Sequence, residues 1–328
     1  MFPMKKYSWP VVLGAFCVLL FSCYRDIDLE SYRGEPTLVL NSVVSPSGTV
    51  RASLSRTWFF TDGKTDTSLG DAKVELYING GFAEEMVSHP ERAGMYVSSI
   101  VPHPGESVKI IATTIYGTVW AEDTVPFAAG IEETALGVRK YDDGSRIITQ
   151  DGSSEVNHAV EVTYGITFEE IPGEADYYLI RISDSENSLL SGTLDYSSDP
   201  VFIDQFPQLG GALGNRKIGG QGGRVFSDAA IEGKRYTLTV KETAYASDFA
   251  SESSFDRRIS LYALSKPYYL YFLSLQSMED GLMQDMVDLG FTEPRRVYSN
   301  VEGGTGILGA SERFEVEVSL RNIIEALL

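Results

Sequence analysis

Hydrophobic and polar residues alternate along most of this chain, and this period of two constrains its fold more than any other feature. Val74, Leu76 and Ile78 form one such stretch, which the turn residues Asn79 and Gly80 close. Successive side chains of a strand point to opposite faces, so the pattern predicts strands with one buried face. Short strands that recur between turn signals are typical of β-sandwiches. We therefore predict a mainly β protein.

The pattern divides the chain into two β-rich regions. Residues 37–127 are predicted to form an N-terminal β-sandwich of the immunoglobulin or transthyretin type. Residues 128–155 are polar and acidic, and we interpret them as a linker. Residues 156–328 are predicted to form a C-terminal β-rich domain that carries one or two helices.

One helix is clearly signalled in the C-terminal region. Ser265 can cap its N-terminus, and Pro267 suits the first turn, where a missing N–H costs little. Apolar residues then recur at helical steps of three and four: Tyr268, Tyr271, Phe272 and Leu275. The spacing predicts a helix near 266–279, and a second, acidic helical piece is expected over 282–289.

The N-terminal residues have the layout of a lipoprotein signal peptide. Lys5 and Lys6 precede an apolar run, and the small residue Ser22 stands directly before Cys23. We predict cleavage after Ser22, a diacylglyceryl group on the Cys23 thiol, and acylation of its new amine by a fatty acid such as palmitate. Residues 23–36 would then be a lipidated tether.

The predicted lipid would hold the protein at a membrane, since several acyl chains give stable anchoring. An uncleaved helical anchor is the alternative, but the apolar run is too short to cross a bilayer comfortably. Cleavage removes two lysines and no acid from a chain of net charge −19, which leaves −21. A body this acidic repels nucleic acid, so we expect no nucleic-acid partner.

The sequence shows no recognisable catalytic or metal-binding pattern. Cys17 leaves with the signal and Cys23 carries lipid, so the body has no thiol for catalysis or metal binding. The histidines have no metal-ligating spacing; they are His89, His103 and His158. Adjacent acids on a strand point to opposite faces, and acids in turns are solvated, so no pair suits hydrolysis. The pairs are Glu84-Glu85, Glu132-Glu133, Asp142-Asp143 and Glu169-Glu170. We expect no enzyme activity, no metal and no cofactor.

Two segments are candidates for contact with a ligand or partner. Trp58, Phe59 and Phe60 run into a turn, which predicts an aromatic contact patch near a loop tip. Residues 209–223 contain seven glycines and lack the order of a phosphate-binding loop. We expect a long loop there, whose role the sequence leaves open.

Several motifs, in order, resemble one protein family. They are Leu38-Val39-Leu40, Val50 to Ser55, Val225 to Asp228, Gly233 to Tyr236, Leu261 to Ser265, Tyr268 to Tyr271, and Val297 to Gly304 with Gly306 to Gly309. Together they resemble a family of Bacteroidetes outer-membrane lipoproteins that is defined by a domain of unknown function. The resemblance implies an N-terminal β-sandwich followed by a β-rich domain with a helix. Members are typically encoded beside TonB-dependent receptors, the plugged barrels that import nutrients.

From this resemblance we expect a lipid-anchored outer-membrane protein, with surface exposure left open. It would be a non-catalytic accessory to a TonB-dependent receptor, helping to capture a nutrient or glycan. A surface adhesin or structural module that binds host or matrix polymer is the first alternative. A hydrolase with an unrecognised carboxylate pair is the second.

Overall fold

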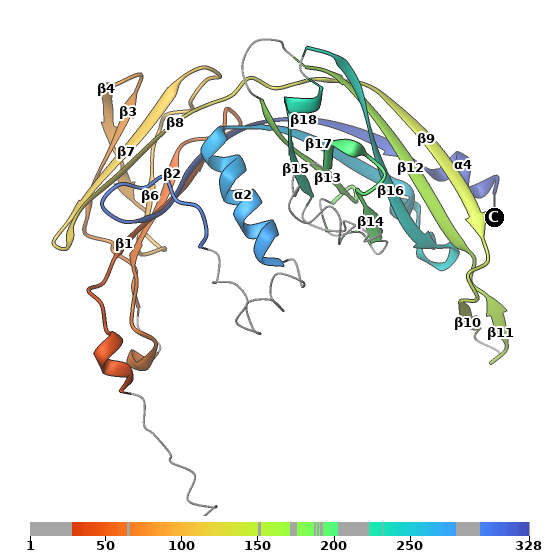
Figure 1. Cartoon of the computed structure of the whole chain (residues 1–328), viewed down its shortest axis with the longest axis horizontal. Helices are drawn as coiled ribbons and strands as arrows, with labels where there is room; N and C mark the ends of the chain where they lie inside the picture. Colours follow the sequence, from red (N-terminus) through yellow and green to blue (C-terminus); the bar gives the residue numbers. More distant parts are fainter. Residues whose placement is uncertain are drawn as a thin grey trace, which may run out of the picture. The chain divides into compact units, whose positions relative to one another are not determined.

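The computed structural model describes residues 28–63, 66–149, 152–170, 176–186, 188, 190, 193–202, 223–231, 233–279 and 296–327 (Figure 1). These residues fall into two compact units. The first contains residues 28–36 and the described part of 58–66, and the second contains the rest. Cys23, nearly all of the glycine-rich segment and the expected helix over 282–289 lie outside the described residues.

Strands dominate the described chain, which confirms the predicted fold class. The strands are β1 (Leu38–Val44), β2 (Arg51–Arg56), β3 (Lys73–Ile78), β4 (Gly81–Glu85), β5 (Val87–Ser88), β6 (Met95–Val97), β7 (Ser107–Thr114), β8 (Gly117–Thr124), β9 (Ile131–Tyr141), β10 (Arg146–Ile148), β11 (Ser154–Val156), β12 (Ala159–Glu169), β13 (Tyr177–Ser183), β14 (Thr193–Asp195), β15 (Arg224–Ser227), β16 (Arg235–Tyr245), β17 (Asp256–Leu264) and β18 (Thr305–Ser319). The α-helices are α2 (Lys266–Glu279) and α4 (Arg321–Glu325). Short 3-10 helices are η1 (Leu29–Tyr32), η2 (Phe60–Asp62), η3 (Pro200–Phe202), η4 (Asp228–Ala230), η5 (Ala246–Asp248) and η6 (Glu252–Phe255). Within the described part, no helix is long and apolar enough to span a bilayer.

The N-terminal β-sandwich encloses one of the two large hydrophobic cores. Its first sheet has the order β4-β3-β7-β8, and the second contains β1, β2, β6 and β5. Leu40, Leu76 and Ile110 are fully buried between them. Each lies at an inward position of its alternating strand, as the period of two predicts.

Residues 37–127 do not complete this sandwich alone. β18, from near the end of the chain, pairs in parallel with β1, with Val39 opposite Thr305 and Val44 opposite Ala310. β1 would otherwise be an edge strand with unpaired backbone groups. The later half of β18 pairs with β17. β18 therefore lies beside the N-terminal core in its first half and beside the C-terminal core in its second half.

The first half of β18 approaches β1 closely because it contains glycine. Gly306 has a φ of +117°, and a methyl group there would lie 2.1 Å from the Leu40 carbonyl oxygen. No other residue fits this position, since both the backbone angle and the space require a missing side chain.

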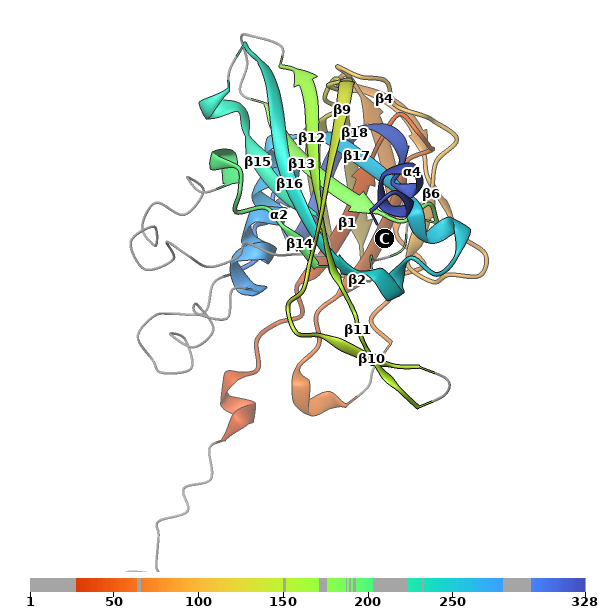
Figure 2. The same ribbon diagram turned by 90° about the vertical axis from the view of Figure 1, so that its right-hand side faces the viewer.

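The C-terminal core lies between the sheet β14-β16-β12-β9 and the strands β15, β13, β17 and β18. The expected linker over 128–155 is wrong, because β9, β10 and β11 lie within or overlap it. β9 pairs with β12 along most of its length, as Figure 2 shows. Its exposed positions carry no large apolar residue, and its half-buried positions include Leu136 and Val138. An edge strand of this kind has few strongly apolar residues, so its sequence resembles a linker.

An ion pair is buried in the C-terminal core. Glu242 on β16 is fully buried, and Arg257 on β17 is 4% exposed. The Arg257 Nε and Nη2 atoms donate to the two Glu242 carboxylate oxygens at 3.0 and 2.8 Å. The Tyr164 hydroxyl donates to the same carboxylate. Burial lowers the pKa of Arg257, but the hydrogen bond and charge of Glu242 outweigh it and raise that pKa overall.

Candidate functional site

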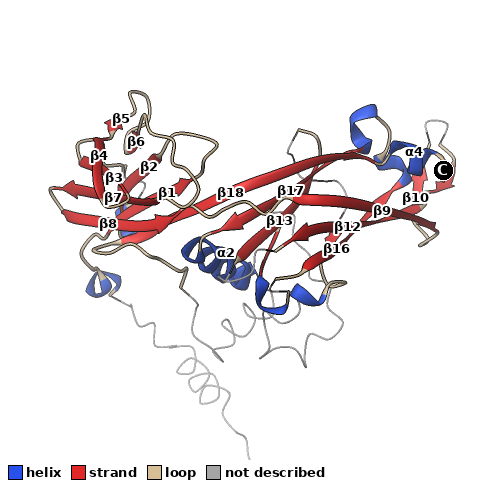
Figure 3. Ribbon diagram, turned by 90° about the horizontal axis from the view of Figure 1, so that it is seen from above, coloured by secondary structure: helices blue, strands red, loops and turns tan. Residues whose placement is uncertain are grey.

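Helix α2 begins where the sequence predicts, at a serine cap. The Ser265 Oγ atom accepts a hydrogen bond from the Tyr268 amide at 3.3 Å, and the Ser265 carbonyl accepts one from Tyr269 at 2.9 Å. The helix lies against β13, β15 and β18, on one face of the eight-stranded sheet β15-β13-β17-β18-β1-β2-β6-β5 (Figure 3). The predicted span of 266–279 is confirmed.

The cap also ties the helix to the N-terminal sandwich. The Ser265 hydroxyl donates to the carboxylate of Asp123 on β8, and Ala310 donates its amide to Ser265 Oγ at 3.2 Å. Asp123 is 7% exposed, and burial raises its pKa to about 7 despite these hydrogen bonds. α2 is therefore held at its N-terminus by two strands from different parts of the chain.

The underside of α2 packs on a small apolar cluster. The Tyr269 ring stacks on Tyr177 with centroids 4.6 Å apart, above Leu179 and Val225. Tyr268 lies directly over Gly309 of β18, where a methyl group would be 2.6 Å from the tyrosine ring. The helix therefore has little freedom to move towards the sheet.

A groove of about 430 Å³ lies between α2 and the outer face of the adjacent strands. Its helical wall consists of Tyr268, Tyr271 and Phe272. Its floor is formed mainly by outward-facing side chains of β1, β2, β6 and β18: Asn41, Val43, Arg51, Ser53, Met95 and Ile307. This volume is within the usual range for small-molecule sites.

The groove combines aromatic surface with hydrogen-bond donors. The Asn41 Oδ1 atom accepts the Ile307 amide at 3.2 Å, which fixes the side chain and directs its donating nitrogen elsewhere. Arg51 is exposed, and among the described residues no carboxylate forms an ion pair with it. Burial raises the pKa of Tyr268 to about 12, so its hydroxyl stays neutral at physiological pH.

These side chains suit binding better than acid–base chemistry. The described lining residues include no His, Cys, Asp or Glu. Aromatic rings can stack on sugar or other ring faces, while the Arg51 guanidinium can bind hydroxyl or carboxylate oxygens. The groove can therefore hold a small polar ligand.

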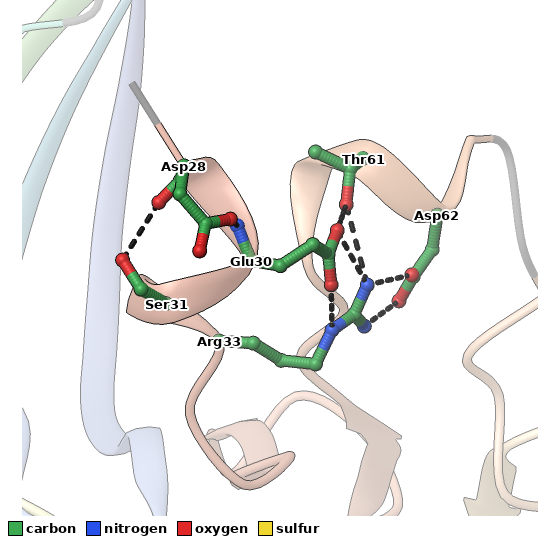
Figure 4. A network of polar contacts seen from close by, with 6 residues as sticks. All are labelled: Asp28, Glu30, Ser31, Arg33, Thr61 and Asp62. Carbon is green, nitrogen blue, oxygen red and sulfur yellow. Dashed lines mark hydrogen bonds and ion pairs between the residues drawn. The ribbon is translucent and has the colours of Figure 1, made fainter. Parts of the chain in front are cut away.

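The predicted aromatic patch lies elsewhere, in the first compact unit. The Trp58 and Phe60 side chains are 55% and 64% exposed. The rings of Phe59 and Phe60 are 4.6 Å apart, and the Arg33 guanidinium lies 4.8 Å from the Phe59 ring centre. Figure 4 shows the polar contacts by which Arg33 joins this loop to the tether.

The candidate acids and histidines are dispersed. In the described chain, no group of three or more His, Cys, Asp or Glu side chains is arranged to hold a metal ion. Glu169, the last residue of β12, is exposed, and Glu170, just beyond the strand, is buried. Glu132 and Glu133, in contrast, both contact Arg235, at 2.7 and 3.3 Å. A bulge in the β9–β12 pairing brings them to one side, so the opposite-face argument fails there.

Sequence reasoning missed the groove as a site. The aromatic residues of α2 carry a helical period, which does not by itself distinguish a ligand wall from packing. Asn41, Arg51 and Ser53 occupy the polar positions of alternating strands and resemble an ordinary solvent-facing surface. Only the position of α2 over that surface distinguishes them.

Gly309→Ala tests how closely α2, the helical wall of the groove, packs on β18. A methyl group 2.6 Å from the Tyr268 ring must displace α2, which we expect to cost about 1–3 kcal/mol of unfolding free energy. Gly130→Ala is the control, because its nearest neighbour would be 3.9 Å away. Denaturant midpoints of both variants provide the measurement. Equal midpoints would contradict the close packing of Tyr268 on β18.

Comparison with known proteins places the chain in a family without assigning an activity. No curated protein matches it. The profile of the family described as "Domain of unknown function (DUF4249)" matches residues 25–316, which include the α2 groove and the aromatic patch. The chain therefore belongs to the DUF4249 family.

Proposed function

We propose that this protein is a non-catalytic, lipid-anchored outer-membrane protein that captures a small ligand for a TonB-dependent receptor. The observation that carries this proposal is the groove beside α2. It is the place in the described chain where aromatic faces, an amide and an exposed guanidinium converge on a volume of ligand size.

The ligand class follows from the side chains of the groove. Tyr271 and Phe272 offer ring faces, and Arg51 and Asn41 offer hydrogen-bond donors on the opposite side. A nutrient or glycan with a ring and several oxygen atoms matches both sets. The walls stand on paired strands and on a capped helix, so the groove is largely formed before binding.

The membrane and receptor parts of the proposal have separate support. The sequence around Cys23 supports the lipid anchor, and the resemblance of the chain to outer-membrane lipoproteins supports the receptor partner. An anchored capture protein would raise the local concentration of ligand at the receptor mouth.

The test is a mild-detergent pull-down of the C-terminally tagged, full-length protein from outer membranes. We expect a barrel receptor in near-stoichiometric amount, identified by mass spectrometry, and a small molecule released on denaturation. Recovery of the protein alone would contradict the receptor partnership and favour a surface adhesin.

Groove variants then test where the small molecule binds. Tyr271→Ala and Arg51→Ala should each reduce the recovered small molecule about tenfold, because each removes roughly 1–1.5 kcal/mol of contact, and leave receptor recovery unchanged. Tyr116→Ala and Arg146→Ala are matched controls, exposed residues that do not line the groove. Equal loss in the controls would contradict binding in the groove.

A further inference from the structure

One arginine, Arg33, joins the predicted tether to the loop that carries the aromatic patch. Arg33 forms ion pairs with Glu30 in η1 and with Asp62 in η2, both at 2.7 Å. A second guanidinium nitrogen donates to Asp62 at 3.0 Å, and Thr61 donates its hydroxyl to Glu30 at 2.7 Å (Figure 4). The hydrogen bonds to Asp62 and then Glu30 raise the pKa of Arg33. The loop that carries the patch is thus held to the chain segment nearest the predicted lipid.

The contacts of Arg33 cover one of the three aromatic residues and leave the other two exposed. Phe59 lies under the Arg33 guanidinium, 4.8 Å from it, and is half-buried. Trp58 and Phe60 remain 55% and 64% exposed, with no covering element in the described part of their unit. Exposed aromatic side chains this close in the chain can together form an apolar contact surface.

The distance to the predicted lipid limits where this patch can lie. Four residues lie between Cys23 and Asp28, the residue that caps η1. Whatever their conformation, the five steps from one Cα atom to the next span at most about 18 Å. The patch is therefore confined to the region just above the membrane surface if Cys23 carries acyl chains.

Charge and side-chain chemistry favour the bilayer interface over a protein surface as the occupant. Tryptophan prefers the headgroup region, where its ring is partly apolar and its N–H stays hydrated. Arg33 pairs with two acids of this unit, Glu30 and Asp62, which reduces but does not remove the negative charge near the aromatic residues. The acidic body gives no electrostatic attraction to a membrane, so any second attachment besides the lipid must be apolar.

We propose that Trp58 and Phe60 insert into the headgroup region of the anchoring membrane and form a second attachment point beside the lipid. This inference rests on the lipid anchor of the proposed function. Two points of attachment restrict rotation of the tether unit about its lipid, whereas the lipid alone does not.

The experiment uses the tryptophans of the chain as reporters. Trp9 lies in the predicted signal, so Trp120→Phe leaves Trp58 as the single tryptophan of the mature protein. The lipidated, full-length variant is reconstituted into phosphatidylcholine–phosphatidylethanolamine vesicles, with or without bromine on the acyl chains. We expect Trp58 to emit at a shorter wavelength than a tryptophan exposed to water. Brominated lipid should quench this emission about twofold, as for interfacial tryptophan.

The matched control is Trp58→Phe, which leaves Trp120 on β8 as the single tryptophan. Its emission should be the same in both kinds of vesicle. Vesicle flotation and mass measurement of the N-terminal peptide report the lipid independently. Unquenched Trp58 in a floating, lipidated protein would overturn the inference and leave the proposed function intact. A protein that does not float would overturn the anchor and this inference together.

Discussion

Arg257→Ala is expected to lower the free energy of unfolding by about 3–5 kcal/mol, because it leaves a buried charge without its partner. Arg257 is 4% exposed and Glu242 is fully buried, and two hydrogen bonds of 3.0 and 2.8 Å join them. Without the guanidinium, the Glu242 carboxylate keeps only the Tyr164 hydroxyl among the partners that the structure describes.

A neighbouring arginine provides a matched control for this effect. Arg258 pairs with Glu317 at 2.9 Å, but the Glu317 side chain is 67% exposed. Ion pairs at the surface contribute about 0–1 kcal/mol, so Arg258→Ala should change stability little. Urea unfolding of the wild type and the two variants measures both effects. Similar urea midpoints for the two variants would show that burial does not increase the contribution of the Arg257–Glu242 pair to stability.

Much of the fold could be predicted because its cause is local. The burial of alternate residues in β3 and β7 follows their hydrophobic pattern directly. The start of α2 follows from Ser265 and Pro267, whose chemistry suits a helix N-terminus. These features depend on neighbouring residues alone, so the sequence displays them.

The rest depends on pairing between distant segments. The glycines near 306 mark the first half of β18, but nothing local shows that this segment lies in parallel against β1. The groove has the same origin, because Arg51 and the aromatic residues of α2 line one space only when α2 lies on the sheet beside β1 and β2. The β9 strand was missed because an edge strand needs few apolar residues.

A second large effect is expected from pH, through Asp123. Burial raises its pKa in the folded protein to about 7, against 3.8 for an exposed aspartate. Between these pH values the folded protein holds a proton that the unfolded chain has lost, so stability falls as pH rises through this window. Below it, both states are protonated and the stability is fully present. Above it, the buried carboxylate costs about 4 kcal/mol, the free-energy equivalent of the difference in pKa.

Asp123→Asn should remove this loss of stability with rising pH. An asparagine has no proton to lose at this position, and its amide oxygen can accept the Ser265 hydroxyl, whose Oγ atom already accepts the Tyr268 and Ala310 amides. We expect the variant to match the wild type near pH 4 and to exceed it by about 3–4 kcal/mol at pH 8. Denaturant unfolding at both pH values provides the measurement.

Asp143→Asn is the control for the pH series. The Asp143 side chain is exposed, and hydrogen bonds from Ser145 lower its pKa in the folded protein, so its carboxylate is ionised in both states from pH 5 upwards. Any difference between Asp143→Asn and the wild type should therefore be the same at pH 5 and pH 8. A gap between Asp123→Asn and the wild type that stays constant over the same range would contradict a proton held at Asp123. A widening gap would place the proton at Asp123, beside the cap of α2.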